Sequence, residues 1–573
     1  MKNQEMARIF NEIADLLELK GENPFRIRAY RRAALNIEGF VRDIAETPKE
    51  ELMKIPGIGQ DLAGKMEEFI ETGTVRLYED LKREVPEGFG LLLSVPGLGP
   101  KTAKLLSEKL KVSNLDDLER LARGHKLSGL PGIKEKTEEN ILKGIEMLRR
   151  RTDRQPLGKV LPVADDIVER LKKKASIDRV VVAGSIRRWK DTIRDIDILA
   201  TARDAKAVMD AFVHLPQVRD VLMRGPTKSS VLVDEGLQVD LRVVEEGSFG
   251  AALAYFTGSK AHNIRLREMA AKAGLKINEY GIFRETDEKK IGGEREEDVY
   301  RILGLPYISP ELREDGGEIE AALEGRLPNL VTLSDIKGDL HVHTKRSDGS
   351  HDFADLIEEA RKRGYEYLAI TDHSKGLGVA GGLNEERILE EQKEIEGINK
   401  RMKGFRLLAG VEVDIRSDGR LDLPDEVLRR LDIVVASIHS GFRQSREQIT
   451  NRLVSAMRNP YVSVIAHPTG RLIGERDPYA VDMQEVIDVA KETGTALEIN
   501  AYPLRLDLND FHAKLSKQAG AKVVICTDTH VRSQFDYMTY GVSIARRGWL
   551  EKNDVLNTLH YRALTKALKK HVE

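Results

Sequence analysis

The chain has 573 residues, and this length predicts about three or four domains rather than one compact core. Its 92 basic and 94 acidic side chains leave a formal net charge of −2, so no overall basic bias indicates a nucleic-acid partner. The composition, 41% apolar and 32% charged, excludes a largely disordered or collagen-like chain. No apolar run approaches the roughly 18 residues of a membrane span, and the start lacks a secretory signal, so we expect a cytoplasmic protein without a membrane partner.

Cysteine and histidine usage restricts the chemistry further. Cys526 is the only cysteine, so an intrachain disulfide is excluded and any metal must be held mainly by imidazoles and carboxylates. Only three of the 13 histidines, His125, His214 and His262, precede residue 340. This uneven distribution indicates two different chemistries in one chain.

A short turn recurs within the first 150 or so residues, which otherwise read as amphipathic helices. It appears as Ile55-Pro-Gly-Ile-Gly59, as Val95-Pro-Gly-Leu-Gly99 and, more weakly, as Leu130-Pro-Gly-Ile-Lys134. A single copy would fit an ordinary glycine-rich helix connection equally well. Two good copies favour helix-hairpin-helix turns, whose N–H groups approach the DNA backbone without reading bases. The predicted DNA-binding positions are Gly57, Gly59, Gly97 and Gly99.

From about residue 158 the pattern changes to a helix and three strands, which predicts an α/β domain. In the strand that begins Asp195-Ile-Asp197, a period of two places both carboxylates on one face, and Asp240 on a later strand could complete a cluster of three. Hard oxygen ligands of this kind suit Mg²⁺ with bound phosphates. A lone pair of aspartates would more often be a solvated strand edge. Here, however, the strand that ends in Gly184-Ser185 can present N–H groups to a phosphate, and Arg187 and Arg188 follow as candidate triphosphate ligands.

The order GSIRR, DIDIL, VDLR and YFTGS after the hairpin turns resembles the family X DNA polymerases, such as DNA polymerase beta, over residues 1 to 310. The resemblance implies that Asp195, Asp197 and Asp240 hold two Mg²⁺ ions, and that Asp240 helps to activate the primer 3′-hydroxyl. Lys260 stands where polymerase beta has an acid that contacts the incoming base. The resemblance assigns nucleotide binding to Gly184, Ser185, Arg188, Tyr255, Phe256, Gly258, Asn263 and Arg267.

A lyase activity is a further implication of this resemblance. Lys65 matches the lysine with which the family attacks an abasic sugar as a Schiff base. Tyr30 and Arg26 are compatible with the pocket, but Asp61 stands where the family places a basic ligand of the 5′-phosphate. An ordinary solvated lysine therefore stays as the alternative.

After an acidic segment with Gly-Gly and Pro, at least seven apolar strands alternate with helices and end in polar motifs. The pattern predicts a parallel α/β barrel with its chemistry at the C-terminal ends of the strands. Closure of such a barrel would gather nine nitrogen and oxygen ligands suited to Zn²⁺ or Mn²⁺ at one mouth. They are His341, His343, Asp348, His373, Glu412, His439, His467, Asp528 and His530.

The segments HVHT, TDH, GVEVD, SIH, AHP and TDTH resemble the PHP domain, the polymerase and histidinol phosphatase family of metal-dependent phosphoesterases. The resemblance implies a distorted seven-stranded β/α barrel with up to three Mn²⁺ or Zn²⁺ ions. One ion would be held by His341, His343, Glu412 and Asp528, a second by Glu412, His439 and His467, and a third by Asp348, His373 and His530. Asp348 stands where some members have histidine, which favours Mn²⁺.

The predicted fold class is therefore multidomain, with a helical helix-hairpin-helix region, an α/β nucleotidyltransferase palm with a thumb, and a C-terminal PHP barrel. The expected divisions are residues 1–85, 86–155, 156–250 (palm), 251–315 (thumb), 316–334 (linker) and 335–573 (PHP).

The leading hypothesis is a monomeric bacterial or archaeal family X polymerase that fills short gaps in base excision repair. It would act on gapped or primer-template DNA and deoxynucleoside triphosphates. Its PHP domain would add a 3′-to-5′ exonuclease or phosphoesterase and an abasic-site endonuclease. The alternatives are a nucleotidyltransferase with a phosphatase that acts on RNA or a small molecule, and a non-enzymatic scaffold that binds DNA ends.

Overall fold

The structure is a computed structural model, and it divides the chain into two compact units, Met1–Asp153 and Arg154–Glu573. None of the helices in the described part of the chain combines the length and apolar character that crossing a bilayer requires. The residues described are 2–20, 22–38, 44–53, 58–83, 92, 95, 98, 100–112, 114–127, 130, 137–138, 141–142, 145 and 154–568.

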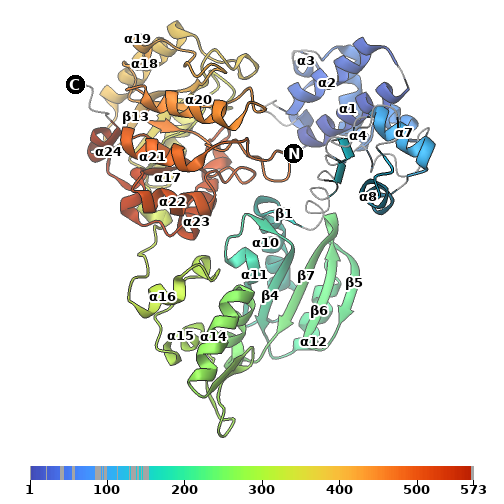
Figure 1. Ribbon diagram of the computed structural model, residues 1–573, viewed down its shortest axis with the longest axis vertical. Coiled ribbons are helices and arrows are strands. Elements are labelled where there is room, and N and C mark those ends of the chain that lie inside the picture. The colour runs from blue at the N-terminus through green and yellow to red at the C-terminus, as the bar shows by residue number, and fades with distance from the viewer. Residues whose placement is uncertain are drawn as a thin grey trace. The chain divides into compact units, whose positions relative to one another are not determined.

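The first unit is helical, as its sequence predicts (Figure 1). Leu62, Met66 and Phe69 recur at helical spacing in α4 and are buried, and α4 ends at Gly73, whose φ of 76° is left-handed. Phe10 and Tyr30 join the same core, with their rings edge to face at 5.4 Å. The described helices are α1 (Lys2–Leu19), α2 (Pro24–Glu38), α3 (Lys49–Leu52), α4 (Gln60–Thr72), α5 (Arg76–Arg83), α7 (Pro100–Leu110) and α8 (Leu115–Arg123).

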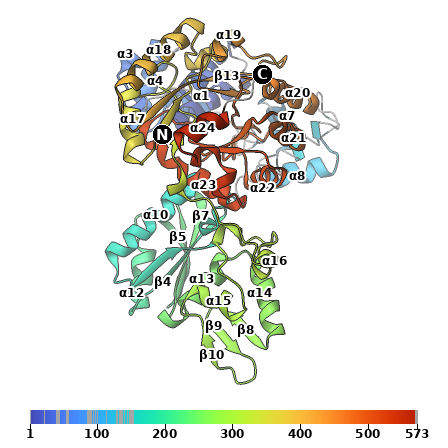
Figure 2. The same cartoon turned by 90° about the vertical axis from the view of Figure 1, so that its left-hand side faces the viewer.

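The second unit begins with a five-stranded sheet in the order β2-β4-β7-β6-β5, in which only β4 and β7 run parallel. Helices α10 and α12 pack on one face and α13 on the other (Figures 1 and 2). The elements of this palm are β1 (Gln155–Pro156), α10 (Leu157–Lys174), β2 (Arg179–Val182), α11 (Gly184–Arg187), β3 (Thr192–Ile193), β4 (Asp195–Thr201), α12 (Ala205–Val213), β5 (Val218–Arg224), β6 (Lys228–Val233) and β7 (Leu237–Val243).

A smaller domain follows the palm, built around a three-stranded antiparallel sheet in the order β10-β9-β8 (Figure 2). Residues 316–334, expected as a linker, contain the helix α16, whose Ile319 and Ala322 pack into the core of this domain. Part of this segment is therefore packed against the smaller domain. The elements are α13 (Phe249–Thr257), α14 (Lys260–Lys272), β8 (Leu275–Asn278), β9 (Gly281–Arg284), β10 (Lys290–Gly292), α15 (Glu296–Ile302) and α16 (Glu318–Leu323).

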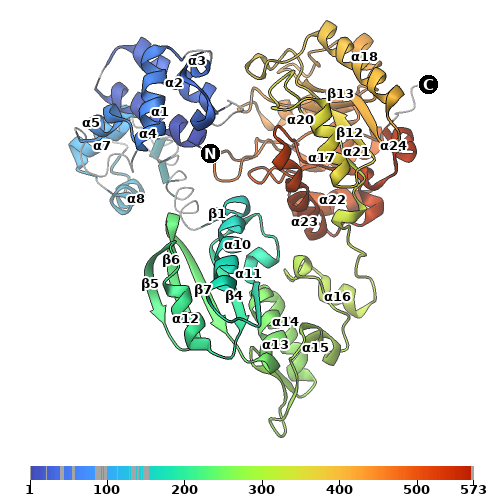
Figure 3. The ribbon, with the colours of Figure 1, turned by 180° about the vertical axis from the view of Figure 1, so that it is seen from behind.

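The C-terminal part is the expected seven-stranded barrel, with all strands parallel in the order β11 to β17 (Figure 3). A parallel bridge between Val342 and Thr529 joins the chain after β11 to the chain after β17, so the barrel is nearly closed. Leu564 and Leu568 of α24 join the apolar cluster that includes the first residues of β12, β14 and β16, so α24 lies at the end opposite the predicted ligands.

The strands of the barrel are β11 (Gly338–Asp339), β12 (Tyr367–Ile370), β13 (Arg406–Asp414), β14 (Ile433–Ser437), β15 (Val464–Ile465), β16 (Ala496–Asn500) and β17 (Val523–Cys526). Its helices are α17 (Phe353–Lys362), α18 (Glu385–Arg401), α19 (Asp425–Leu428), α20 (Arg446–Arg458), α21 (Met483–Thr493), α22 (Asp510–Ala519), α23 (Met538–Arg547) and α24 (Tyr561–Leu568).

Candidate active sites

The three palm aspartates lie on one face of the sheet. Asp197 of β4 and Asp240 of β7 are direct partners in the parallel ladder, and Asp195 precedes Asp197 by one period of the strand. The alternating Ile196 and Ile198 are buried against α10 and α12, which leaves the acids on the opposite face. The hydrophobic alternation of β4 therefore fixes which way the carboxylates point.

Electrostatics indicate a place for a cation between these acids. Burial raises the pKa of Asp197 to about 6, and the nearby Asp195 and Asp240 add to the rise. Gln238 donates a hydrogen bond to Asp240 at 2.8 Å, and Lys228 lies 3.8 Å from it. The carboxylates repel one another unless a cation lies between them, and carboxylate oxygens are the ligands that Mg²⁺ prefers.

The Gly184-Ser185 turn lies directly against this cluster. Gly184 has a φ of 61°, and a Cβ built there would lie 2.4 Å from Oδ2 of Asp197. Only glycine fits this close approach without strain. Ser185 is half-buried beside it.

The two arginines after this turn have different surroundings. Nη1 and Nη2 of Arg187 donate to the two carboxylate oxygens of Glu296 at 2.6 and 2.7 Å, and Arg187 also donates to Thr257. Arg187 is therefore engaged in an ion pair between the palm and the smaller domain. Arg188 lies 3.0 Å from Glu314 and donates to the carbonyl oxygen of Thr257.

The remaining predicted nucleotide residues cluster around the end of α13. The rings of Tyr255 and Phe256 meet edge to face at 5.1 Å, and Arg242 stacks on Phe256 at 4.5 Å. Asn263 donates to the carbonyl oxygen of Tyr255 at 2.6 Å, and a Cβ at Gly258 would lie 2.5 Å from Oδ1 of Asn263.

Arg267, the last of these nucleotide residues, is exposed on α14. Its Nε donates to the carbonyl oxygen of Asn263, one helical turn earlier, at 3.3 Å.

In the first unit, Lys65 lies in α4 and forms an ion pair with Asp61, one turn earlier. Its Nζ is 6.0 Å from the centre of the Tyr30 ring. The buried hydroxyl of Tyr30 has no hydrogen-bond partner among the described residues. Gly59 precedes α4 as its N-cap, whereas Gly57, Gly97 and Gly99 lie outside the described residues.

The nine predicted barrel ligands come together at the C-terminal ends of the strands. Glu412, at the end of β13, is central: its carboxylate lies 3.4 Å from Nε2 of His341, 3.3 Å from His439, 3.2 Å from His467 and 2.8 Å from His373. Nε2 of His343 is 3.2 Å from Asp528.

The remaining ligands surround Asp348, and eight of the nine residues, all but His467, fall into overlapping groups. Asp348 lies 3.4 Å from His373 and 3.3 Å from His530. Donor atoms within 4.8 Å of one another form three groups: His341 with His343 and Asp528; His373 with Glu412 and His439; and His343 with Asp348, His373 and His530.

Unpaired donor atoms show that this cluster fits metal ions. Nε2 of His341, both ring nitrogens of His343 and Oε2 of Glu412 are buried without a hydrogen-bond partner among the described residues. Buried polar atoms are costly to leave unpaired, and coordination to a cation would satisfy them.

The ionisation of the cluster also suits ligation. Burial lowers the pKa of His343 to about 4 and that of His467 to about 3, so both imidazoles are neutral, the form that binds metal. Burial alone would raise the pKa of Glu412, but His373, His439 and His341 outweigh it and hold the pKa well below its usual range.

Two further carboxylates, which the sequence reasoning did not assign, contact histidines of the cluster. Glu498 accepts a hydrogen bond from Nδ1 of His341 and another from the backbone N–H of His467, each at 2.7 Å. Asp414 lies 3.4 Å from Nδ1 of His439. Carboxylates in this position fix the tautomer and orientation of ligating imidazoles. For Glu498, the sequence signal was an acid between the apolar residues Leu497 and Ile499 of a predicted strand.

Arg505 is a third residue that the sequence reasoning missed. Its Nε lies 3.9 Å from Oδ2 of Asp528, and its Nη1 is buried without a hydrogen-bond partner among the described residues. The loop that carries it is held by Arg471, which donates to its carbonyl oxygen at 2.7 Å. A fixed cation with a free donor next to the cluster is suited to bind a phosphate oxygen.

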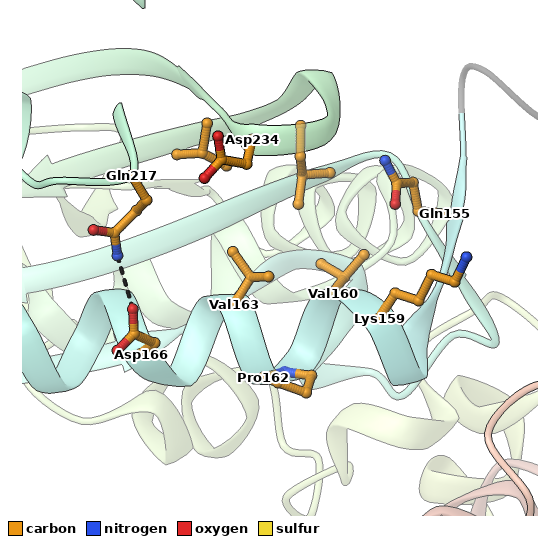
Figure 4. Close-up of a pocket in the computed structure, with 10 residues that line it drawn as sticks. Gln155, Lys159, Val160, Pro162, Val163, Asp166, Gln217 and Asp234 are labelled. Carbon is orange, nitrogen blue, oxygen red and sulfur yellow. Dashed lines mark hydrogen bonds between the residues drawn. The ribbon is translucent and has the colours of Figure 1, made fainter. Parts of the chain in front are cut away.

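The palm also has a pocket of about 300 Å³ on the α10 face of its sheet, the face opposite the acids (Figure 4). Val160, Val163 and Leu237 form its apolar wall, and Gln217 donates to Asp166 across it at 3.0 Å. It contains none of the predicted site residues.

Fold and sites together define a protein that joins a nucleotidyltransferase palm to a barrel of the phosphoesterase type. Four family models match successive parts of the chain. They are a helix-hairpin-helix domain at residues 1–75, a SAM-like helix-hairpin-helix tandem at 89–146, a DNA polymerase beta thumb at 252–314 and a PHP domain at 339–502.

Relatives extend this match to the whole chain. The DNA polymerase/3′-5′ exonuclease PolX of Bacillus subtilis is 40% identical over 575 residues and covers 100% of both chains. Probable phosphatases of Caldanaerobacter subterraneus and Acetivibrio thermocellus are each 32% identical over 36% and 34% of this chain, and over 80% and 79% of their own lengths. The chain therefore belongs to the PolX family, the family X DNA polymerases that carry a PHP domain.

Proposed function

We propose that the chain fills short gaps in DNA as a DNA-directed DNA polymerase and removes 3′-terminal nucleotides in its barrel. The observation that carries the polymerase half is the side-by-side pairing of Asp197 with Asp240, next to the glycine turn at Gly184. Family X membership supports the same activity.

In the palm, Asp195, Asp197 and Asp240 would hold two Mg²⁺ ions, which would stabilise the charge on the triphosphate and lower the pKa of the primer hydroxyl. The chain itself positions the reactants. The Gly184-Ser185 turn and Arg188 would bind the triphosphate, while Tyr255 and Phe256 would pack against the sugar. Asp240 would accept the proton of the primer 3′-hydroxyl.

Primer extension tests this half of the proposal against its alternatives. A labelled primer across a one-nucleotide gap should be extended with Mg²⁺, with a second reaction in Mn²⁺. Activity on RNA or a small-molecule acceptor without activity on gapped DNA would favour a different nucleotidyltransferase. Binding of DNA ends without any extension would favour a scaffold.

In the barrel, up to three Mn²⁺ or Zn²⁺ ions would activate a water and neutralise charge on the phosphate. The chain holds the imidazoles in ligating orientation through Glu498 and Asp414 and supplies Arg505 as a fixed cation. Next to a polymerase, the expected substrate is the 3′-terminal phosphodiester of DNA. The same chemistry would extend to removal of a 3′-phosphate and to incision at abasic sites.

Replacement of Arg505 with alanine should lower exonuclease kcat/KM by roughly 10- to 100-fold, because a hydrogen bond to a charged group contributes about 1.5–3 kcal/mol. Bound metal, measured by mass spectrometry, should stay unchanged because Arg505 is not a ligand. Arg420, an exposed arginine that pairs with Asp418 on the same domain, provides the control Arg420→Ala. Wild-type exonuclease activity in Arg505→Ala would contradict a contact with the phosphate.

A lyase activity at Lys65 is the remaining proposal for the first unit. Borohydride should trap a covalent complex with abasic DNA through this amine, and Lys65→Ala should abolish the trapping. Because Asp61 engages the amine of Lys65 in an ion pair, Asp61→Asn should release this amine and trap faster. The control is Lys49→Ala, which removes another lysine of the same unit that pairs with a glutamate. Trapping that persists in Lys65→Ala would assign the chemistry to a different amine.

We further propose that the protein works as a monomer in the cytoplasm, because both sites are built within one chain and the DNA substrate is found there.

A further inference from the structure

Arg188, the proposed triphosphate ligand, is held on several sides. Its Nη1 donates to the carbonyl oxygens of Thr257 and Gly258 at 2.6 and 3.3 Å, and its Nε lies 3.0 Å from Oε1 of Glu314. Only 12% of its side chain is exposed. The orientation of this guanidinium therefore depends on Glu314, a residue outside the palm.

The barrel contacts both Arg188 and Glu314 through Arg547, the last residue of α23 (red in Figure 3). Its Nη1 donates to the backbone carbonyl oxygen of Arg188 at 2.7 Å and lies 3.1 Å from Oε1 of Glu314. Its Nη2 donates to Asp510, the first residue of α22, at 2.6 Å. With 3% of its side chain exposed, Arg547 is fixed between the two domains.

Charges alternate along this chain of contacts, from Asp510 through Arg547 and Glu314 to Arg188. Burial alone would raise the pKa of Glu314, but Arg188 and Arg547 outweigh it and lower the pKa. Glu314 therefore stays ionised and is shared between two cations. Without Arg547, its charge would act on Arg188 alone and would compete with an incoming triphosphate. The backbone of Arg188 would lose a charge-assisted hydrogen bond at the same time.

From this geometry we infer that Arg547 of the barrel is a positioning residue of the polymerase site. It holds the backbone of Arg188 and shares the charge of Glu314, so that Glu314 competes less with the triphosphate for the Arg188 guanidinium. The inference rests on the proposed role of Arg188. It makes the barrel a structural part of the nucleotide site as well as the site of hydrolysis.

Steady-state gap filling by the full-length protein tests this inference. Arg547→Ala should raise the KM for the deoxynucleoside triphosphate by roughly five- to tenfold, the effect of one charge-assisted hydrogen bond, and leave kcat within about twofold. Inhibition by pyrophosphate should weaken in parallel. Lysine at this position can donate to the carbonyl oxygen but cannot also span Glu314 and Asp510. The KM of Arg547→Lys should therefore lie between those of the wild type and Arg547→Ala.

The matched control is the preceding residue on the same helix. Arg546 pairs with Glu311 at 2.7 Å and donates to the carbonyl oxygen of Val331, but makes no contact with Arg188. Arg546→Ala should leave the KM for the nucleotide unchanged. An equal rise in KM in Arg546→Ala and Arg547→Ala would mean that general loosening of the interface is responsible, and would overturn the inference.

The double variant separates failure of the inference from failure of the proposed role of Arg188. If Arg547 acts through Arg188, Arg547→Ala should add little to the KM of Arg188→Ala. A full additional effect in that background, or an unchanged KM in Arg547→Ala alone, would overturn the inference. An unchanged KM in Arg188→Ala would instead refute the triphosphate role on which it rests. Exonuclease activity should be retained throughout, and its loss in Arg547→Ala would show a defect of the barrel itself.

Discussion

Asp240→Asn is expected to reduce primer extension on gapped DNA by a factor on the order of 10³ or more, about 4 kcal/mol of lost transition-state stabilisation. Asparagine keeps the shape of aspartate and can still contact Gln238, so the fold should persist. It removes the charge that faces Asp197 across the ladder, and with it the carboxylate oxygen that we propose accepts the proton of the primer hydroxyl. Single-turnover extension with Mg²⁺ measures the effect.

The control for this change is Asp234→Asn, in the connection between β6 and β7. Asp234 is exposed and pairs with Arg219 at the surface, so its substitution should leave extension unchanged. Extension by Asp240→Asn at near the wild-type rate would contradict the proposed catalytic role of the palm acids.

Glu412→Gln is expected to abolish hydrolysis in the barrel, also by a factor on the order of 10³. Five imidazoles lie within 3.6 Å of the carboxylate of Glu412, and an amide can neither bridge cations nor balance the charge of these histidines. The bound Mn²⁺ or Zn²⁺ per chain should fall together with the exonuclease rate.

Glu426→Gln provides the matched control, because Glu426 is exposed on α19 of the same barrel. Full metal content with lost activity in Glu412→Gln would assign Glu412 to catalysis rather than to metal binding. Full activity would contradict its position at the centre of the site.

Local patterns in the sequence predict where the candidate acids of both sites lie in the fold. The alternation around Asp195 and Asp197 gives their common face, and the parallel strands of the barrel bring the polar ends of distant segments to one mouth. Strands β5 and β6 were missed. Strand β5 is almost wholly exposed, so it carries no alternation of apolar and polar residues from which a strand could be predicted.

Contacts between distant segments explain what the sequence could not supply. Arg187 and Arg188 are adjacent and chemically identical, yet Glu296, 109 residues later, engages Arg187 in a bidentate pair. Arg505 lies in a loop without a pattern of its own, and its nearness to Asp528 follows from barrel closure. The same holds for Arg547, which meets Arg188 only because the barrel packs against the palm.

The central claim is that one chain holds two separate active sites, and both activities measured side by side on the same gapped DNA test it most directly. A 5′-labelled primer reports extension when nucleotides are present and shortening when they are absent. We predict that Asp240→Asn shortens the primer normally but does not extend it, and that Glu412→Gln extends it normally but does not shorten it. Loss of both activities from either single change would contradict the account.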